Sequence, residues 1–154
     1  MIQEQIRKVL QAEAPVSRSL LCKKILSAWG ISRMGQRLDA RFEELFRQGN
    51  YFRSEHEKNV FYWIDQRQHD QYEIFRIHAE REAIDLPPVE VANAMKHILQ
   101  DEISLPVTDL LKICGQIFGF ARSGSHVEAA MRRGMEEAAR RGYLKLENER
   151  AVIL

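Results

Sequence analysis

The sequence predicts an α+β fold that is mainly α-helical, has small β-hairpins and contains one arrangement twice in tandem. When the chain is shifted by 89 residues against itself, residues 6–41 align with residues 95–130 without a gap, and nine of the 36 pairs are identical. Most of the other pairs keep their polarity, as Trp29 does with Phe118. Self-similarity at a fixed spacing is the signature of a duplication, so we predict two copies of one module.

The best preserved part of the repeat is a short motif in residues 30–35 and again in residues 119–124. Each copy reads Gly, a large apolar residue, any residue, Arg, any residue, Gly. Both copies lie between two segments that carry apolar residues at helical spacing. The motif is therefore predicted to connect two helices in each module.

Two helices are predicted before the motif in module 1. Apolar residues recur at helical spacing in residues 2–10, and the pattern stops before Pro15. The next helix follows Ser17 and stops at Gly30, because glycine readily adopts the positive φ of a helix C-cap. Its predicted buried side carries Leu20, Leu21, Ile25, Ala28 and Trp29.

A third helix and a hairpin complete module 1. The helix begins near residues 32–35 and ends at Gly49. The period then changes to two, and residues 51–54 and 59–63 are predicted strands joined by the charged turn 55–58. The buried side of the helix is predicted to carry Leu38, Phe42, Leu45 and Phe46.

Module 2 repeats this succession. Pro87 and Pro88 suit the first turn of a helix. The next helix follows Pro106, and the third ends at Gly142. The predicted hairpin joins strands 143–146 and 151–154, and the predicted core positions include Val91, Met95, Leu99, Leu110, Leu111, Cys114, Val127, Met131 and Met135.

Three helices followed by a hairpin form a winged helix, which is a helix-turn-helix with a strand pair appended. We therefore predict tandem winged-helix modules over residues 1–65 and 87–154. Residues 66–86 are a polar linker, in which the strand-like alternation of residues 72–77 indicates a possible edge strand.

The charge balance excludes a protein that coats nucleic acid over its whole surface. The chain has 23 Lys and Arg against 22 Asp and Glu, whereas such proteins carry a large positive excess. The charge is uneven, with 11 basic and 8 acidic residues in residues 1–65, 3 and 5 in residues 66–87, and 9 and 9 in residues 88–154. The first third is therefore the better candidate for a surface that faces phosphates.

Sequence patterns of other functional classes are missing. The sequence has no apolar run of about 20 residues for a membrane span and no secretory start. Its histidines have no i, i+4 pair or cysteine partner for zinc, and it contains neither a phosphate-binding P-loop nor a serine elbow. We expect a cytoplasmic protein that is not an enzyme, binds no metal or cofactor, and keeps Cys22 and Cys114 as buried free thiols.

The repeated motif lies where a helix-turn-helix protein contacts DNA. In a helix-turn-helix, the recognition helix enters the major groove with its N-terminal residues nearest the bases. The free N–H groups of a helix N-terminus, flanked by Arg33 or Arg122, would form a phosphate clamp, and Gly35 or Gly124 would allow close approach of a ligand. An alternative remains open, in which Arg33 and Arg122 only pair with acids such as Glu13 and Glu102.

The candidate nucleic-acid contacts come from both modules. Module 1 contributes Ser32, Arg33, Gly35, Gln36, Arg37, Arg41, Arg53 and Lys58. Module 2 contributes Arg122, Ser123, Ser125, His126, Arg133 and Lys145, with Ala130 on the same predicted exposed face. The hairpin cations among them are equally expected to be ordinary solubilising charges.

The stretches that begin at Ala28, Asp85 and Gly119 resemble a bacterial domain of unknown function found at the carboxyl end of very large superfamily I helicase-like proteins. The usual strings of that family are close to D-I-P-P-E-E-I-A-N-A and G-F-x-R-T-G-S, and the corresponding residues here read D-L-P-P-V-E-V-A-N-A from Asp85 and G-F-A-R-S-G-S from Gly119. In module 1, the string A-W-G-I-S-R-M-G from Ala28 is similar to the family's A-W-G-x-x-R-x-G. Ser123 replaces the usual threonine, and Met34 departs further.

The resemblance covers nearly the whole chain and implies a setting of DNA or RNA handling, in proteins that often carry ATPase and nuclease-like segments. The helicase motifs are absent, so ATP hydrolysis is not implied for this chain. We hypothesise a non-catalytic accessory domain that binds nucleic acid, most simply duplex DNA. The competing hypothesis is a protein-interaction or scaffolding module that packs against a helicase or nuclease domain, or against a second copy as a homodimer.

Overall fold

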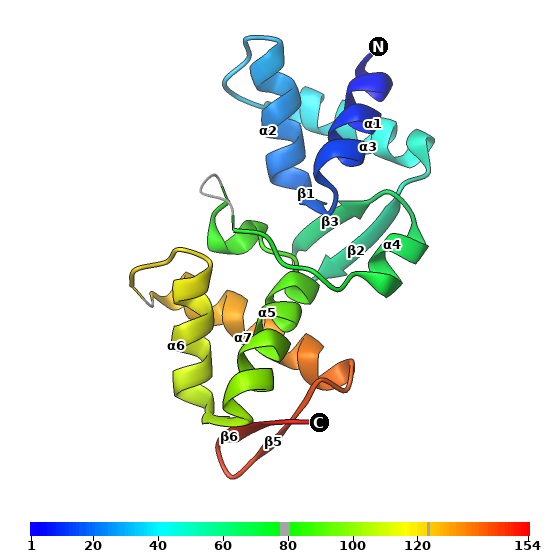
Figure 1. Ribbon diagram of the computed structural model, residues 1–154. Coiled ribbons are helices and arrows are strands. Elements are labelled where there is room, and N and C mark those ends of the chain that lie inside the picture. The colour runs from blue at the N-terminus through cyan, green and yellow to red at the C-terminus, as the bar shows by residue number, and fades with distance from the viewer. Residues whose placement is uncertain (78–80, 123) are drawn as a thin grey trace. The chain divides into compact units, whose positions relative to one another are not determined.

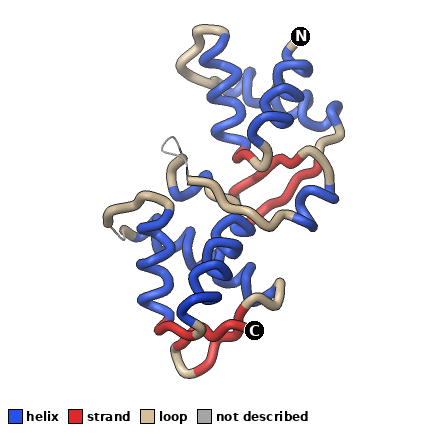
Figure 2. Tube along the Cα trace, in the orientation of Figure 1, coloured by secondary structure: helices blue, strands red, loops and turns tan. Residues whose placement is uncertain are grey.

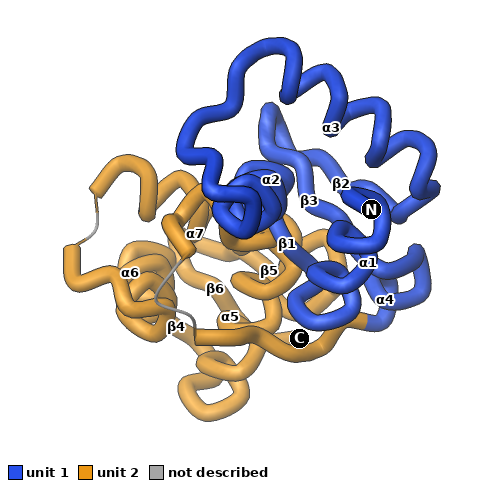
Figure 3. Tube along the Cα trace, turned by 90° about the horizontal axis from the view of Figure 1, so that it is seen from above, with its two compact units in different colours: residues 1–71 blue, residues 72–154 orange. Residues whose placement is uncertain are grey.

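Each half of the chain folds around its own core in the computed structural model, which describes residues 1–77, 81–122 and 124–154. Unit 1 comprises Met1–Gln71 and unit 2 comprises Tyr72–Leu154, drawn in blue and orange in Figure 3. The division falls inside the predicted linker. The fold is mixed α+β and mainly helical (Figures 1 and 2).

The same order of elements occurs in both units: helix, short strand, helix, helix and hairpin. In unit 1 these are α1 (Ile2–Glu13), β1 (Val16–Ser17), α2 (Arg18–Ala28), α3 (Gln36–Gly49), β2 (Phe52–His56) and β3 (Asn59–Trp63), followed by α4 (Gln66–Gln71). In unit 2 the 3-10 helix η1 (Ala83–Asp85) precedes α5 (Pro88–Glu102), β4 (Ser104–Pro106), α6 (Val107–Ile117), α7 (Ser125–Arg140), β5 (Leu144–Glu147) and β6 (Arg150–Ile153).

Each unit has a three-stranded antiparallel sheet of the same topology. The strand orders are β1-β3-β2 and β4-β6-β5, so the last strand of the hairpin lies in the middle. In unit 1, Val16 pairs with Tyr62, and in unit 2, Leu105 pairs with Ala151. The hairpins were predicted, but the short strands β1 and β4 were not.

Local sequence signals explain where several elements begin and end. The Oγ of Ser17 accepts a hydrogen bond from the Leu20 N–H at 3.1 Å and caps α2. Gly30 and Gly119 follow α2 and α6 with φ of 73° and 93°, as predicted for helix stops. In the second hairpin, Asn148 and Glu149 both have positive φ, which is the conformation of a two-residue type I′ turn.

The apolar helix faces and the inner sides of the sheets form two separate cores. That of unit 1 contains Ile6, Leu10, Leu21, Phe42 and Phe46 among others, and that of unit 2 contains Met95, Leu99, Leu110, Met131 and Leu144. Cys22 and Cys114 are buried free thiols, as predicted. Burial raises the pKa of Cys22 to about 11 and that of Cys114 to about 12.

Two predictions about side chains and strands were wrong. Residues 72–77 form no strand, and the linker instead contains α4 and η1. Ala28 and Trp29 are exposed rather than buried. The helix ends at Ala28, and the indole N–H of Trp29 donates to Gln5 Oε1 at 2.7 Å, which holds the ring outside the core.

Candidate nucleic-acid interface

The loop that precedes α3 carries the first copy of the repeated motif. Helix α3 begins at Gln36, directly after Gly35, so Arg33 lies in the loop and not in the first helical turn. Gly35 is the N-cap residue, and no side chain caps the free N–H groups at this end of the helix. These donors and the helix dipole create a local positive potential beside Arg33.

Gly35 is not required by the conformation of the chain. Its φ of −82° and ψ of 174° suit any residue. A Cβ placed on it would have no described atom within 4 Å outside its immediate neighbours. The same is true of Gly124, the N-cap residue of α7. Both positions are therefore bare backbone facing open space.

The cations of module 1 fall into two groups. Arg33, Arg37 and Lys58 are exposed, and none has an ion pair within the described chain. Arg41 and Arg53, in contrast, are already paired. Arg41 lies 3.4 Å from Glu44, and Arg53 lies 3.4 Å from Glu43 and 3.6 Å from Glu55. Ser32 and Gln36 are exposed beside the first group.

The alternative pairing of Arg33 with Glu13 is not found. The carboxylate of Glu13 instead forms an ion pair with Lys24, with 2.9 Å between Glu13 Oε1 and Lys24 Nζ. The acids of α3 are also engaged elsewhere, because Arg18 of α2 lies 2.8 Å from Asp39 and 3.2 Å from Glu43. No described acid therefore neutralises Arg33.

The second module presents a smaller polar surface than predicted. Arg122, Ser125 and His126 are exposed, whereas Ser123 lies outside the described residues. Ala130, predicted on the exposed face, is only 2% exposed and belongs to the core. Ala130 therefore lies on the buried side of α7 and not on the predicted exposed face.

Two further cations of the second module, Arg133 and Lys145, already interact with other groups of the chain. Arg133 is partly buried and already takes part in an interaction. On the hairpin, Lys145 lies 3.1 Å from Glu147. Among the described residues, the cations of the predicted site that have no ion pair therefore lie in module 1, apart from Arg122.

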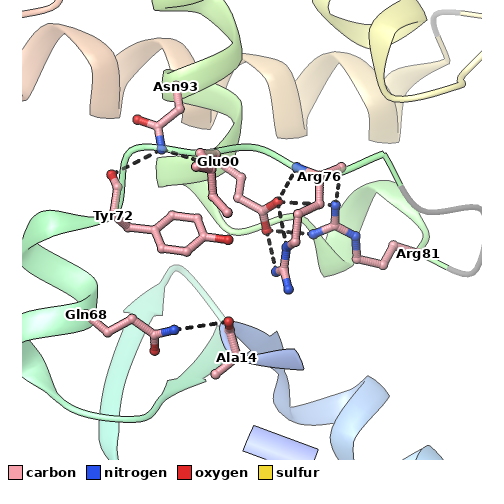
Figure 4. Close-up of polar contacts among 8 residues, drawn as sticks. Ala14, Gln68, Tyr72, Arg76, Arg81, Glu90 and Asn93 are labelled. Carbon is pink, nitrogen blue, oxygen red and sulfur yellow. Dashed lines mark hydrogen bonds and ion pairs between the residues drawn. The ribbon is translucent and has the colours of Figure 1, made fainter. Parts of the chain in front are cut away.

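Sequence reasoning missed a polar cluster at the start of α5, shown in Figure 4. The carboxylate of Glu90 is fully buried and accepts the backbone N–H of Arg76 at 2.9 Å. It also pairs with the guanidinium groups of Arg76 at 2.8 Å and Arg81 at 2.6 Å. One turn along the helix, the Asn93 amide donates to the carbonyls of Tyr72 at 3.1 Å and Ile74 at 2.8 Å.

This cluster explains the conformation of residues 72–77. Side chains of α5 bond the Arg76 N–H and the carbonyls of Tyr72 and Ile74, so these groups do not pair with a neighbouring strand. Residues 72–77, called the strap below, are thereby held against the start of α5. Burial raises the pKa of Tyr72, at the start of the strap, to about 12. The available signal was the presence of Glu90 and Asn93, three residues apart, in an otherwise apolar helix start. In unit 1, the Gln68 amide donates to the Ala14 carbonyl at 3.1 Å (Figure 4).

Two hollows accompany these surfaces, one in each unit. In unit 1 a groove of about 330 Å³ lies between α2 and the loop before α3. In unit 2 a cavity of about 410 Å³ is lined by residues of the strap, α5 and Tyr143. No three described His, Cys, Asp or Glu side chains come together as a metal site requires. Among the described residues, no helix has both the length and the apolar character of a membrane span.

The comparisons with known proteins give one partial match. Residues 1–40 match the family described as "Protein of unknown function (DUF3320)". The matched stretch contains α1, β1, α2, the loop with Arg33 and the first residues of α3. No curated protein and no solved structure matches the chain. The first module thus contains a segment similar to a domain of unknown function, and it is the segment with the unpaired Arg33.

Proposed function

We propose that the chain is a non-catalytic, tandem winged-helix domain that binds duplex DNA through phosphate contacts, mainly with module 1. The order helix, strand, helix, helix and hairpin in both units supports the winged-helix assignment. The strand order also supports it, because the last strand of each hairpin pairs with the short strand that precedes the second helix of its unit. In this arrangement α3 is the recognition helix.

One observation carries the proposal. Arg33 and Arg37 are exposed and unpaired within the described chain, and they flank the uncapped N-terminus of α3. Arginine binds phosphate through charge-assisted hydrogen bonds, and free helix N–H groups add donors that point at the same ligand. Bare backbone at Gly35 would let a phosphate approach these donors closely.

The wing offers a second contact. Lys58 lies in the turn of the first hairpin, is exposed and has no ion pair within the described residues. A wing cation of this kind can reach the DNA backbone beside the groove that the recognition helix enters. Arg41 and Arg53 would have to leave their carboxylate partners first, so we assign them a smaller part.

Module 2 would contribute less binding energy. Its exposed Arg122, Ser125 and His126 occupy the places of Arg33, Gln36 and Arg37, but with fewer permanent cations. We infer that it positions module 1 or adds a weak contact. The resemblance to helicase-associated domains supports an accessory place in a larger bacterial protein that handles nucleic acid.

The proposal is tested by titrating the whole chain with a duplex oligonucleotide at increasing salt. Phosphate contacts release counterions, so the logarithm of the binding constant should fall linearly with the logarithm of the salt concentration, by about 0.9 per neutralised phosphate. Binding that does not depend on salt, or no binding at low salt, would refute the proposal.

A further inference from the structure

The groove of about 330 Å³ in unit 1 has a mixed lining of apolar and hydroxyl groups. This size lies in the range of sites that hold a ligand or an anchoring side chain, which is roughly 300–1,000 Å³. The groove adjoins the motif loop but does not include Arg33 or Arg37. Its lining includes Lys23, Leu26, Ser27, Ile31 and Met34.

The duplication supplies an internal reference for this groove. Ile31 corresponds to Phe120 in the repeat. The two loops begin alike, because the N–H of Ile31 donates to Leu26 O at 2.9 Å and the N–H of Phe120 donates to Gly115 O at 3.0 Å. Phe120 packs against the core of its unit, whereas Ile31 is 38% exposed. Module 1 therefore lacks the aromatic ring that module 2 supplies from its own chain.

The loop around the groove exposes further apolar surface. Trp29 is 49% exposed and Met34 is 36% exposed. The residue that corresponds to Trp29 is Phe118, which is buried in unit 2. At positions 29 and 31, the residue of module 1 is more exposed than its counterpart in module 2. Of these exposed residues, Ile31 and Met34 both line the groove, and exposed apolar groups that lie together indicate a binding surface.

The charges beside the groove indicate what kind of segment would fit. Lys23 lines it, and Arg33 and Arg37 lie nearby in the sequence, all three exposed and without an ion pair among the described residues. The acids of the following helix, Asp39 and Glu43, are held by Arg18. A partner segment would therefore meet positive charge around an apolar hollow.

We propose that this groove is a docking site for an acidic protein segment that inserts one aromatic side chain. The inserted ring would take the part that Phe120 plays in module 2, and the carboxylates on either side would pair with Lys23 and Arg33. This interaction goes beyond the proposed DNA binding. It would also compete with DNA, because Arg33 can serve only one anionic partner at a time.

The test uses the whole chain and a synthetic peptide of twelve residues, built from Glu and Ser with one central Phe. Binding is followed by the amide resonances of the labelled protein. We expect shifts at Leu26, Ile31 and Met34, and at least about tenfold weaker binding when the central Phe is replaced by Ala, since burial of a phenyl ring is lost. Equal binding of both peptides would overturn the proposal, because plain charge attraction would then suffice.

Two variants close the groove without removing a cation. Ile31→Phe copies the residue of module 2, and Ser27→Trp fills the groove from α2. Each should abolish binding of the Phe peptide while the affinity for duplex DNA stays within twofold. A variant that is correctly folded and binds the peptide as before contradicts the docking site.

Two other outcomes separate this proposal from the proposed function. Peptide binding by a chain that binds no duplex DNA would refute the proposed function and leave the docking site standing. If instead the groove took single-stranded oligothymidine, with binding lost in Ile31→Phe and no peptide bound, the groove would belong to a nucleobase and the docking proposal would be overturned.

Discussion

Gly134 of α7 lies against Val91 of α5 so closely that a Cβ on the glycine would fall well inside van der Waals contact with the valine side chain. Val91 is fully buried and cannot turn away into solvent. At the spacing of the repeat, module 1 has Leu45 at the corresponding position. The two modules thus share an order of elements but pack their first and third helices differently.

The variant Gly134→Ala should destabilise the protein by about 1–3 kcal/mol, the usual cost of overpacking a core. The gain in helix propensity, about 1 kcal/mol, offsets only part of that cost. Urea unfolding measures the difference. Gly115→Ala in α6 is the matched control, because its Cβ would lie 3.3 Å from Val127 and needs only a small adjustment. Equal stabilities of the two variants would show that α5 and α7 are not packed so closely.

The variant Glu90→Gln should destabilise the protein by about 3–5 kcal/mol, because it leaves the buried Arg81 guanidinium without its carboxylate. Amide hydrogen exchange should also speed up at Arg76, whose N–H bonds Glu90. The control is Glu128→Gln, which breaks an exposed pair with Arg132 and should cost at most about 1 kcal/mol. A strap that exchanges slowly in Glu90→Gln would mean that other contacts hold it.

Because its two thiols are buried, the protein should lose stability in alkaline solution. The folded-state pKa is raised to about 11 for Cys22 and to about 12 for Cys114, from an ordinary value near 9. Burial disfavours the thiolate, so each thiol ionises at a lower pH in the unfolded chain than in the folded one. Below about pH 9 the thiols are neutral in both states, and their ionisation does not lower the stability. The free energy of unfolding should therefore fall as the pH rises from about 9 toward 11 or 12.

This pH dependence is measured by urea unfolding at a series of pH values. Replacing Cys114 by Ala provides the control, since the fall should then become shallower. A wild-type protein with the same stability at pH 8 and pH 10.5 would contradict the burial of the thiols.

Replacing Gly35 by Ala separates folding from binding. The new Cβ meets no described atom, and the loss of a glycine N-cap should cost at most about 1 kcal/mol. DNA affinity should nevertheless fall, because the methyl group occupies the space through which a phosphate would approach. Gly124→Ala is the matched control in module 2 and should affect binding less. Equal affinities of the wild type and Gly35→Ala would remove the glycine from the interface.

The sequence was sufficient to predict the α+β class and the repeated order of helices and hairpins, because most of the long elements carry a clear apolar period. It could not reveal β1, since two residues are too few to show alternation; Val16 and Ser17 form a strand only because β3 lies beside them. The alternation of residues 72–77 suggested a strand, but the side chains of Glu90 and Asn93 bond that backbone instead. Contacts of this kind depend on tertiary structure and leave little trace in a local pattern.

The candidate site was predicted unevenly for the same reason. Arg33 could be found from the repeat and Arg37 from the predicted exposed face of the third helix, and the structure leaves both exposed. Which cations are already paired could not be read from spacing, since Arg53 reaches Glu43 across ten residues of sequence. Ala130 was misplaced because a small residue near the start of a helix fits either the core or the surface.

The central claim is that Arg33 and Arg37 bind phosphate, and the double variant Arg33→Ala/Arg37→Ala tests it most directly. The control is Arg47→Ala, which removes one positive charge from the last turn of α3, away from its N-terminus. Duplex DNA binding of the whole chain is measured over a range of salt concentrations. We expect the double variant to bind about 1–3 kcal/mol more weakly, with a salt slope that is less steep by about 2, while Arg47→Ala binds like the wild type. A double variant with wild-type affinity and slope would contradict the account.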